Sequence, residues 1–177
     1  RKSWGTFWCV DPLDGTKEFI KKNGQFTVNI ALIENGFPTL GVIYTPVTDT
    51  TYYASEGKAF KMVEGITSEI NVNNKNEHRI AVKSASHAAS AEDELLSKYK
   101  VTDAIAVGSS LKFCMVAEGK ADIYYRHGPT MEWDTAAGHA ILDHAGGRVT
   151  DFEGNEILYG KKNLKNPSLI LKSKNII

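Results

Sequence analysis

The spacing of apolar residues changes near residue 77, and this change limits the folds that the chain can adopt. Before it, strand-like runs lie at residues 4–10, 25–33, 39–44 and 50–54. Turn signals such as Asn35-Gly36 and Glu56-Gly57 separate these runs, which is typical of an antiparallel meander. Residues 58–77 alternate only weakly and end in the polar stretch NVNNKNEH. We expect the boundary between two halves of the fold at this stretch.

Helical and strand-like segments alternate in the second half, which is typical of an α/β architecture. The predicted strands lie at 79–83, 103–107, 121–125, 148–150 and 169–172, and the predicted helices at 90–99, 109–118 and 133–145. A short helix is also predicted at residues 16–22 of the first half. We therefore expect a mixed α/β (α+β) fold, with a mainly antiparallel β half over residues 1–77 and an α/β half over residues 78–177.

Composition excludes several classes of protein. A chain of 177 residues has the length of one domain and can bury a core without disulfides or a structural metal. Its 21 basic and 21 acidic residues give no net charge, so no overall field would attract a nucleic-acid polymer or an anionic membrane. No apolar run is long enough to span a bilayer. Cys9 and Cys114 lack metal-site spacing and fit buried thiols in a reducing compartment.

The turn Asp11-Pro12-Leu13-Asp14-Gly15 carries the first candidate chemistry. Pro12 and Gly15 would fold the carboxylates of Asp11 and Asp14 to one side and leave the Leu13 carbonyl out of any strand ladder. Three such oxygens suit Mg²⁺, and the amides of Gly15 and Thr16, at the start of the short helix, would suit a phosphate. The alternative is that Asp11 opens a turn and Asp14 is a plain helix N-cap.

Asp134, at the start of the helix predicted at 133–145, is the second candidate. The inner face of that helix is almost all small residues, so it could approach another backbone closely and deliver Asp134 into a crowded site. A third carboxylate beside Asp11 and Asp14 would let two magnesium ions share the site, an arrangement that serves phosphoryl hydrolysis. The alternative is an ordinary first-turn acid that the helix dipole favours.

These segments resemble a known family. WCVDPLDGTKEFI together with EWDTAAGHAILDHAGGRV is similar to the paired motifs of the lithium-sensitive, magnesium-dependent phosphatases, the superfamily of inositol monophosphatase and fructose-1,6-bisphosphatase. KEFIKKNGQFTVNIALIENG and GSSLKFCMVAEGKADIYYR resemble the bacterial 3'(2'),5'-bisphosphate nucleotidases of the CysQ type within it. The resemblance runs from about Phe7 to the C-terminus. It implies one phosphatase domain with the layered α/β/α/β/α sandwich of that superfamily.

The resemblance also implies roles for individual residues. The metal ligands, for two or three Mg²⁺ ions, would be Asp11, the Leu13 carbonyl, Asp14 and Asp134. Contacts to the scissile phosphate would come from Leu13, Asp14, Gly15, Thr16 and Asp134, and Thr16 would help to orient the attacking water.

A second, uncleaved phosphate would be held by cationic and polar side chains of the second half. The resemblance assigns this role to His87, Ser109, Lys112 and Arg126, and charge-assisted bonds from lysine and arginine suit a bound phosphate. The alternatives are that His87 caps a loop and that Lys112 belongs to a solvated helix face.

One part of the family pattern has no counterpart in the sequence. The family carries a metal-ligating glutamate on a helix that precedes the aspartate turn, and only six residues precede Phe7. We therefore expect an N-terminally truncated domain that lacks the superfamily's N-terminal helices. Those helices cover an outer face of the first sheet, so apolar side chains of that face would meet water.

The function implied is hydrolysis of the 3'-phosphate of adenosine 3',5'-bisphosphate (PAP) to AMP, with the sulfated analogue PAPS as a second candidate substrate, in sulfur assimilation. Lithium would inhibit it. The partner would be a small-molecule bisphosphate nucleotide in the cytoplasm; oligomeric state and peripheral association with the inner face of the cell membrane are left open. The alternatives are an inositol-phosphate or sugar-phosphate phosphatase of the same fold and a non-catalytic nucleotide-binding fragment.

Overall fold

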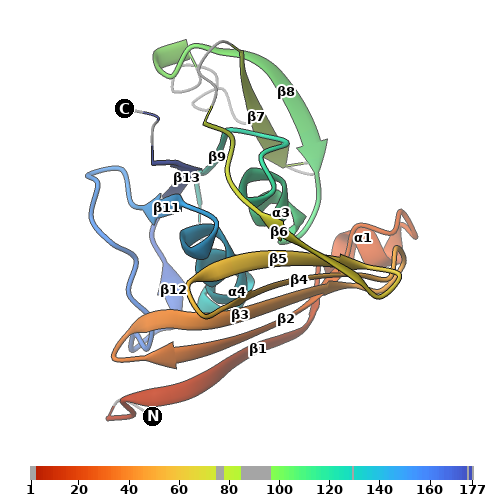
Figure 1. Ribbon diagram of the computed structural model, residues 1–177. Helices are drawn as coiled ribbons and strands as arrows, with labels where there is room; N and C mark the ends of the chain where they lie inside the picture. The colour runs from red at the N-terminus through yellow and green to blue at the C-terminus, as the bar shows by residue number, and fades with distance from the viewer. Residues whose placement is uncertain (1–2, 75–77, 85–96, 129, 175, 177) are drawn as a thin grey trace.

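Two β-sheets, of six and five strands, with helices between them form most of the described part of the chain. The structure is a computed structural model, and it describes residues 3–74, 78–84, 97–128, 130–174 and 176. In Figure 1 the larger sheet lies at the bottom of the view, and α3 (Leu111–Ala117) and α4 (Glu132–His144) lie between it and the smaller sheet. This arrangement confirms the mixed α/β fold.

The first sheet is an antiparallel meander of six strands that are neighbours in chain order. Its strands are β1 (Thr6–Asp14), β2 (Thr27–Glu34), β3 (Phe37–Thr45), β4 (Thr50–Ser55), β5 (Lys58–Val63) and β6 (Ile66–Ile70). The meander is longer than the sequence predicts, because β5 and β6 occupy the stretch that alternates only weakly. β6 is an edge strand with four of its five residues exposed, so it has no apolar face that a sequence pattern could reveal.

β1 also extends further than predicted. The proline at position 12 indicates a strand end after Val10, but β1 continues to Asp14. Its register with β2 shifts between the pairs Asp11–Asn29 and Asp14–Thr27. β1 lies at the edge of the sheet, where a proline that cannot donate a ladder hydrogen bond is tolerated. The strand therefore carries both aspartates on an irregular end.

The second sheet has the strand order β11-β13-β9-β7-β8. Its strands are β7 (Arg79–Ser84), β8 (Val101–Val107), β9 (Ile123–Arg126), β11 (Gly147–Thr150) and β13 (Leu169–Ser173). β7 pairs in parallel with β8 and β9, whereas β13 pairs antiparallel with β9 and β11. The short pair β10 (Thr130–Met131) and β12 (Lys165–Asn166) was not expected. Most of the helix predicted at 90–99 lies outside the described residues.

The described helices are α1 (Thr16–Ile20), α3 (Leu111–Ala117) and α4 (Glu132–His144). α4 packs between the sheets, as its small inner face predicts. A Cβ on Gly41 of β3 would collide with the Ala137 carbonyl oxygen and lie 2.9 Å from Ala140 Cβ. A Cβ on Gly138 of α4 would likewise collide with the ring of Phe113 in α3. The contact at Gly41 fixes how closely α4, and hence its N-terminal end, lies to the first sheet, and the contact at Gly138 fixes its distance from α3.

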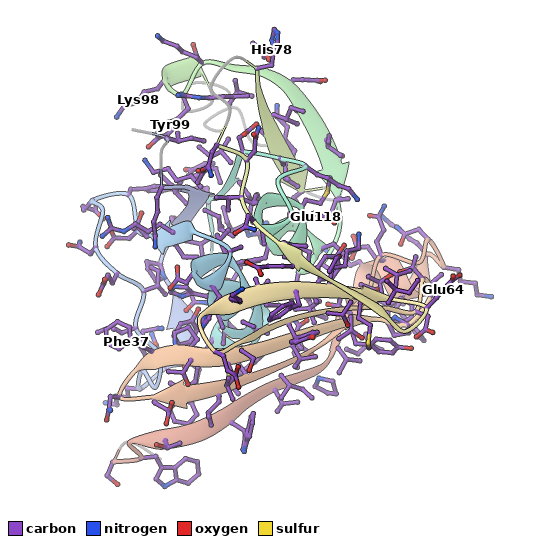
Figure 2. All side chains as sticks on the ribbon, viewed as in Figure 1. Phe37, Glu64, His78, Lys98, Tyr99 and Glu118 are labelled. Atoms are coloured by element: carbon purple, nitrogen blue, oxygen red, sulfur yellow. The ribbon has the colours of Figure 1, made fainter. Side chains whose placement is uncertain are left out.

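A polar contact also joins the first sheet to α3. Glu118, at the end of α3, accepts hydrogen bonds from Lys61 Nζ at 2.8 Å and from the Tyr52 hydroxyl at 3.2 Å. Figure 2 shows Glu118 close to the strands of the first sheet. Tyr52 lies on β4 and Lys61 on β5, so this link is to the part of the first sheet away from β1.

The opposite face of the first sheet carries exposed apolar side chains. Trp8 of β1 is 62% exposed. Val10, Ile30 and Val42 are paired in register across β1, β2 and β3, and all three are exposed. No described helix covers this row. Nor does any described helix have both the length and the apolar character needed to cross a membrane.

Candidate metal centre

The irregular end of β1 positions the first two carboxylates. The amide of Leu13 donates to Asp11 Oδ1 at 3.0 Å, which closes a tight turn over Pro12. Gly15 follows with φ +87°, and a Cβ there would lie 3.0 Å from the Gln25 carbonyl oxygen. Only glycine adopts this conformation without strain, so Gly15 lets the chain turn from β1 into α1.

Asp14 is not the N-cap of α1. The N-cap is Gly15, and no side chain caps the helix, so that alternative reading of Asp14 is wrong. Instead, Asp14 Oδ2 accepts hydrogen bonds from Ser109 Oγ at 2.5 Å and from Ser110 N and Oγ, both at 2.6 Å. α1 has only five residues, so an anion beside Gly15 and Thr16 would depend on turn amides more than on a helix dipole.

Asp134 reaches the same place from the second half of the chain. It lies in the first turn of α4, and its Oδ2 accepts the Met131 amide hydrogen bond at 2.7 Å. Asp134 thus has the capping role that its position suggests and is also part of a cluster. Asp11, Asp14 and Asp134 each offer an oxygen within 4.8 Å of the others.

The electrostatics of this cluster favour a bound cation. Burial raises the pKa of Asp134 from 3.8 to about 6, and the charges of Asp14 and Asp11 add to the rise. Burial also raises the pKa of Asp11. A divalent cation would offset this repulsion, and carboxylate oxygens are the ligands that Mg²⁺ prefers. The donor set therefore fits magnesium.

A cavity of about 160 Å³ adjoins the carboxylates. Its lining includes Asp14, Asp134, Lys112, Tyr124 and Arg126. It brings two of the three clustered carboxylates and two cationic side chains from the second half of the chain to one place.

The two cations in the cavity are held differently. Lys112 is only 8% exposed, so the reading of it as a solvated helix face is wrong. Its Nζ donates to the Ser109 carbonyl at 2.6 Å, and burial lowers the pKa of Lys112 to about 8. Arg126 Nε is buried and has no hydrogen-bond partner among the described residues. A buried guanidinium nitrogen without a partner is costly unless a ligand supplies an acceptor.

The remaining predicted site residues differ in how they relate to the acidic cluster. The Ser109 hydroxyl contacts Asp14 and also Thr27 Oγ1 at 2.7 Å, so it is engaged with the acidic cluster. Leu13 is half-buried and Thr16 is exposed at the start of α1. His87 lies outside the described residues.

Sequence reasoning missed three residues that support the cluster. Ser110, Asn29 and Thr27 are each at most 2% exposed and are linked by hydrogen bonds. A signal was available for two of them. In β2, Thr27 and Asn29 occupy the same face as Ala31 and Ile33, which are core residues. Polar side chains on the apolar face of a strand indicate a buried polar network.

A family model described as the inositol monophosphatase family matches residues 1–176. The chain belongs to the inositol monophosphatase family. It is 52% identical over 159 residues to a protein of Salmonella typhimurium named 3'(2'),5'-bisphosphate nucleotidase CysQ. That alignment covers 90% of this chain, which spans 64% of the length of that curated relative.

Solved structures agree with this assignment. CysQ from Bacteroides thetaiotaomicron, a bacterial member of the inositol monophosphatase family, superposes with a TM-score of 0.89 at 45% identity and covers 98% of this chain and 72% of that one. SaIMPase-II with 2'AMP bound superposes with a TM-score of 0.81 at 25% identity and covers 99% and 67%. The resemblance to this family and its fold is therefore confirmed.

Proposed function

We propose that this protein is a magnesium-dependent phosphatase that removes the 3'-phosphate of PAP. The observation that carries the proposal is the cluster of Asp11, Asp14 and Asp134 within 4.8 Å. It lies beside a cavity lined by Lys112 and by Arg126, whose Nε has no hydrogen-bond partner among the described residues. Acidic groups serve the metal ions and the cleaved phosphate, and cations serve a phosphate that stays on the substrate. A nucleotide with two phosphates matches both parts.

Asp11, Asp14, Asp134 and the Leu13 carbonyl would hold two or three magnesium ions. When bound, these ions supply charge that activates a water molecule and stabilises the leaving oxygen. Thr16 would orient that water, and the turn amides of Gly15 and Thr16 would contact the scissile phosphate. Water adds to phosphorus, the bond from phosphorus to the 3'-oxygen breaks, and that oxygen gains a proton, so PAP and water yield AMP and phosphate.

The second phosphate would lie against Lys112 and Arg126, with Ser109 and His87 as further contacts. Lys112 and Arg126 both line the cavity. Charge-assisted hydrogen bonds to a group far from the cleaved bond add binding energy without taking part in the chemistry. This arrangement would favour PAP, and by the same chemistry PAPS, over substrates with one phosphate.

The relatives support this substrate class. The Salmonella relative and the Bacteroides structure carry the name CysQ, and the former is named a 3'(2'),5'-bisphosphate nucleotidase. We accordingly place the protein in sulfur assimilation with a small-molecule nucleotide partner. Its two cysteines are free and buried, which suits a reducing cytoplasm.

Phosphate release tests the proposal against its two alternatives. We expect release from PAP that needs Mg²⁺, stops with a chelator and exceeds release from inositol 1-phosphate. A preference for inositol 1-phosphate or a sugar phosphate would assign the protein to the inositol-phosphate branch. Binding of PAP by calorimetry without release from any of these substrates would make it a non-catalytic nucleotide-binding protein.

A further inference from the structure

The Asp14 carboxylate is held by the loop between β8 and α3. Its Oδ2 accepts three hydrogen bonds of 2.5–2.6 Å from Ser109 and Ser110, residues 95 and 96 positions away in the chain. Its other oxygen, Oδ1, accepts no hydrogen bond from a described residue. The loop thus fixes one carboxylate oxygen and leaves the other available to a cation.

The hydroxyl of Ser110 does not serve its own helix. Ser110 is the N-cap residue of α3, yet its side chain makes no capping hydrogen bond. Serine at this position ordinarily accepts a hydrogen bond from an amide of the first helical turn. Here the hydroxyl points at Asp14 instead, which a purely helix-stabilising role would not require.

A buried network sets the direction of the Ser110 proton. Asn29 Nδ2 donates to Ser110 Oγ at 2.8 Å, and Thr27 Oγ1 donates to Asn29 Oδ1 at 2.9 Å. Because Ser110 Oγ accepts from Asn29, its own hydrogen is directed to another acceptor. The nearer one is Asp14 Oδ2 at 2.6 Å. Both Asn29 and Ser110 are almost fully buried, so water does not compete.

Ser110 also joins the two elements that carry the acidic cluster. Its Oγ lies 3.1 Å from the main-chain carbonyl oxygen of Asp134 while it donates to Asp14. One hydroxyl therefore contacts the end of β1 and the first turn of α4. A shift of this side chain would change the separation of two carboxylates that a cation must bridge.

We propose that Ser110, assisted by Ser109, is a positioning residue that presents Asp14 to the metal. This inference rests on the proposed function, since it takes Asp14 as a ligand. Hydrogen bonds that orient a ligating carboxylate typically change metal affinity about 10- to 100-fold when removed. Ser110→Ala should therefore weaken metal binding by a factor in that range.

The test is titration of the protein with Mn²⁺ alone, followed by electron paramagnetic resonance of the free ion. Ser173→Ala is the matched control, because Ser173 is 1% exposed and lies at the opposite end of β13 from Leu169, which lines the cavity. We expect Ser110→Ala to lose affinity, Ser173→Ala to keep it and Ser110→Thr, which retains the hydroxyl, to recover at least part of it. Circular dichroism checks that each variant is folded.

Ser109→Ala is a second probe in case Ser110→Ala does not fold. It removes the 2.5 Å bond to Asp14 and leaves the buried Ser110 in place, and it too should weaken Mn²⁺ binding. Parent-like Mn²⁺ affinity in folded Ser110→Ala, or in Ser109→Ala if Ser110→Ala is unfolded, would overturn this inference and leave the proposed metal site standing. Failure of the parent protein to bind Mn²⁺ would overturn both the metal site and this inference.

Discussion

Replacement of Asp134 by asparagine should show separately how much this charge destabilises the metal-free protein and how much it contributes to magnesium binding. Asparagine has nearly the shape of aspartate, and its carbonyl oxygen can still accept the Met131 amide hydrogen bond, which is 2.7 Å long in the structure. The variant therefore removes a charge and little else. We expect Asp134→Asn to be more stable than the parent protein without metal and to lose the response to magnesium.

The size of the first effect follows from the pKa of Asp134. A rise from 3.8 to about 6 means that the folded protein disfavours the charged form, and at neutral pH this corresponds to about 3 kcal/mol. Solvent at the partly exposed carboxylate reduces the figure to roughly 1–2 kcal/mol. The destabilisation by the Asp134 charge is absent below about pH 4, where the carboxyl is protonated in both states, and complete above about pH 7, where it is ionised in both. The stability gained by Asp134→Asn should therefore appear only as the pH rises through this interval.

Thermal unfolding measures both effects. For a protein of this size, 1 kcal/mol corresponds to about 2–4 °C in melting temperature, so metal-free Asp134→Asn should melt roughly 2–8 °C above the parent at pH 7.5. Magnesium at ten times its dissociation constant should stabilise the parent by about 1.4 kcal/mol. It should have little effect on the variant, because one of three ligating carboxylates is gone.

Asp143→Asn is the control, because Asp143 lies at the other end of α4 and pairs with His139. It should keep the full magnesium response. An Asp134→Asn variant that melts below the parent without metal would refute the assignment of an electrostatic cost to this residue. A variant that responds to magnesium as the parent does, or that keeps its phosphatase activity, would leave Asp134 as a helix cap only.

Three further outcomes follow from the same geometry. Gly15→Ala should lose about 1–3 kcal/mol of unfolding free energy in urea, because φ is +87° and a Cβ would lie only 3.0 Å from the Gln25 carbonyl oxygen. Arg126→Ala should raise KM for PAP roughly 10- to 100-fold but barely change KM for a one-phosphate substrate. Lys112→Ala should change KM in the same way and should also lower the melting temperature, because Lys112 Nζ donates a hydrogen bond to the Ser109 carbonyl. Equal losses on both substrates would contradict the second-phosphate role of these two residues. Lithium should inhibit Mg²⁺-dependent phosphate release, because a monovalent ion in a magnesium position compensates less charge, and indifference to lithium would count against the proposed mechanism.

The sequence predicted the acidic cluster because each carboxylate stands beside a local signal. Asp11 and Asp14 flank a proline and precede a glycine, and Asp134 opens a helix with a small inner face. The structure brings all three together. The residues that hold them could not be identified in this way, because Ser110 contacts Asp14 across 96 positions of the chain and looks like an ordinary helix cap in sequence.

The sequence predicts a strand well where one face of that strand is buried and the other is exposed. β2, β3 and β4 alternate between buried and more exposed residues along most of their length, and the sequence predicts them closely. β6 is mostly exposed and β10 and β12 have two residues each, so they have too little periodicity to detect. The end of β1 was misjudged because a proline was read as a strand end, although an edge strand tolerates it.

The position of α4 links the packing of the core to the chemistry of the site. Gly41, Ala137 and Ala140 let α4 lie directly against β3, and Asp134 is one turn upstream of Ala137 on the same rigid helix. A bulkier side chain at this contact would move the helix away from the sheet that carries Asp11 and Asp14. Coulomb repulsion between the three carboxylates acts in the same outward direction when no cation is bound. The small residues of α4 therefore hold the acidic cluster together against its own charge, and a bound cation would add to the cohesion that this packing provides.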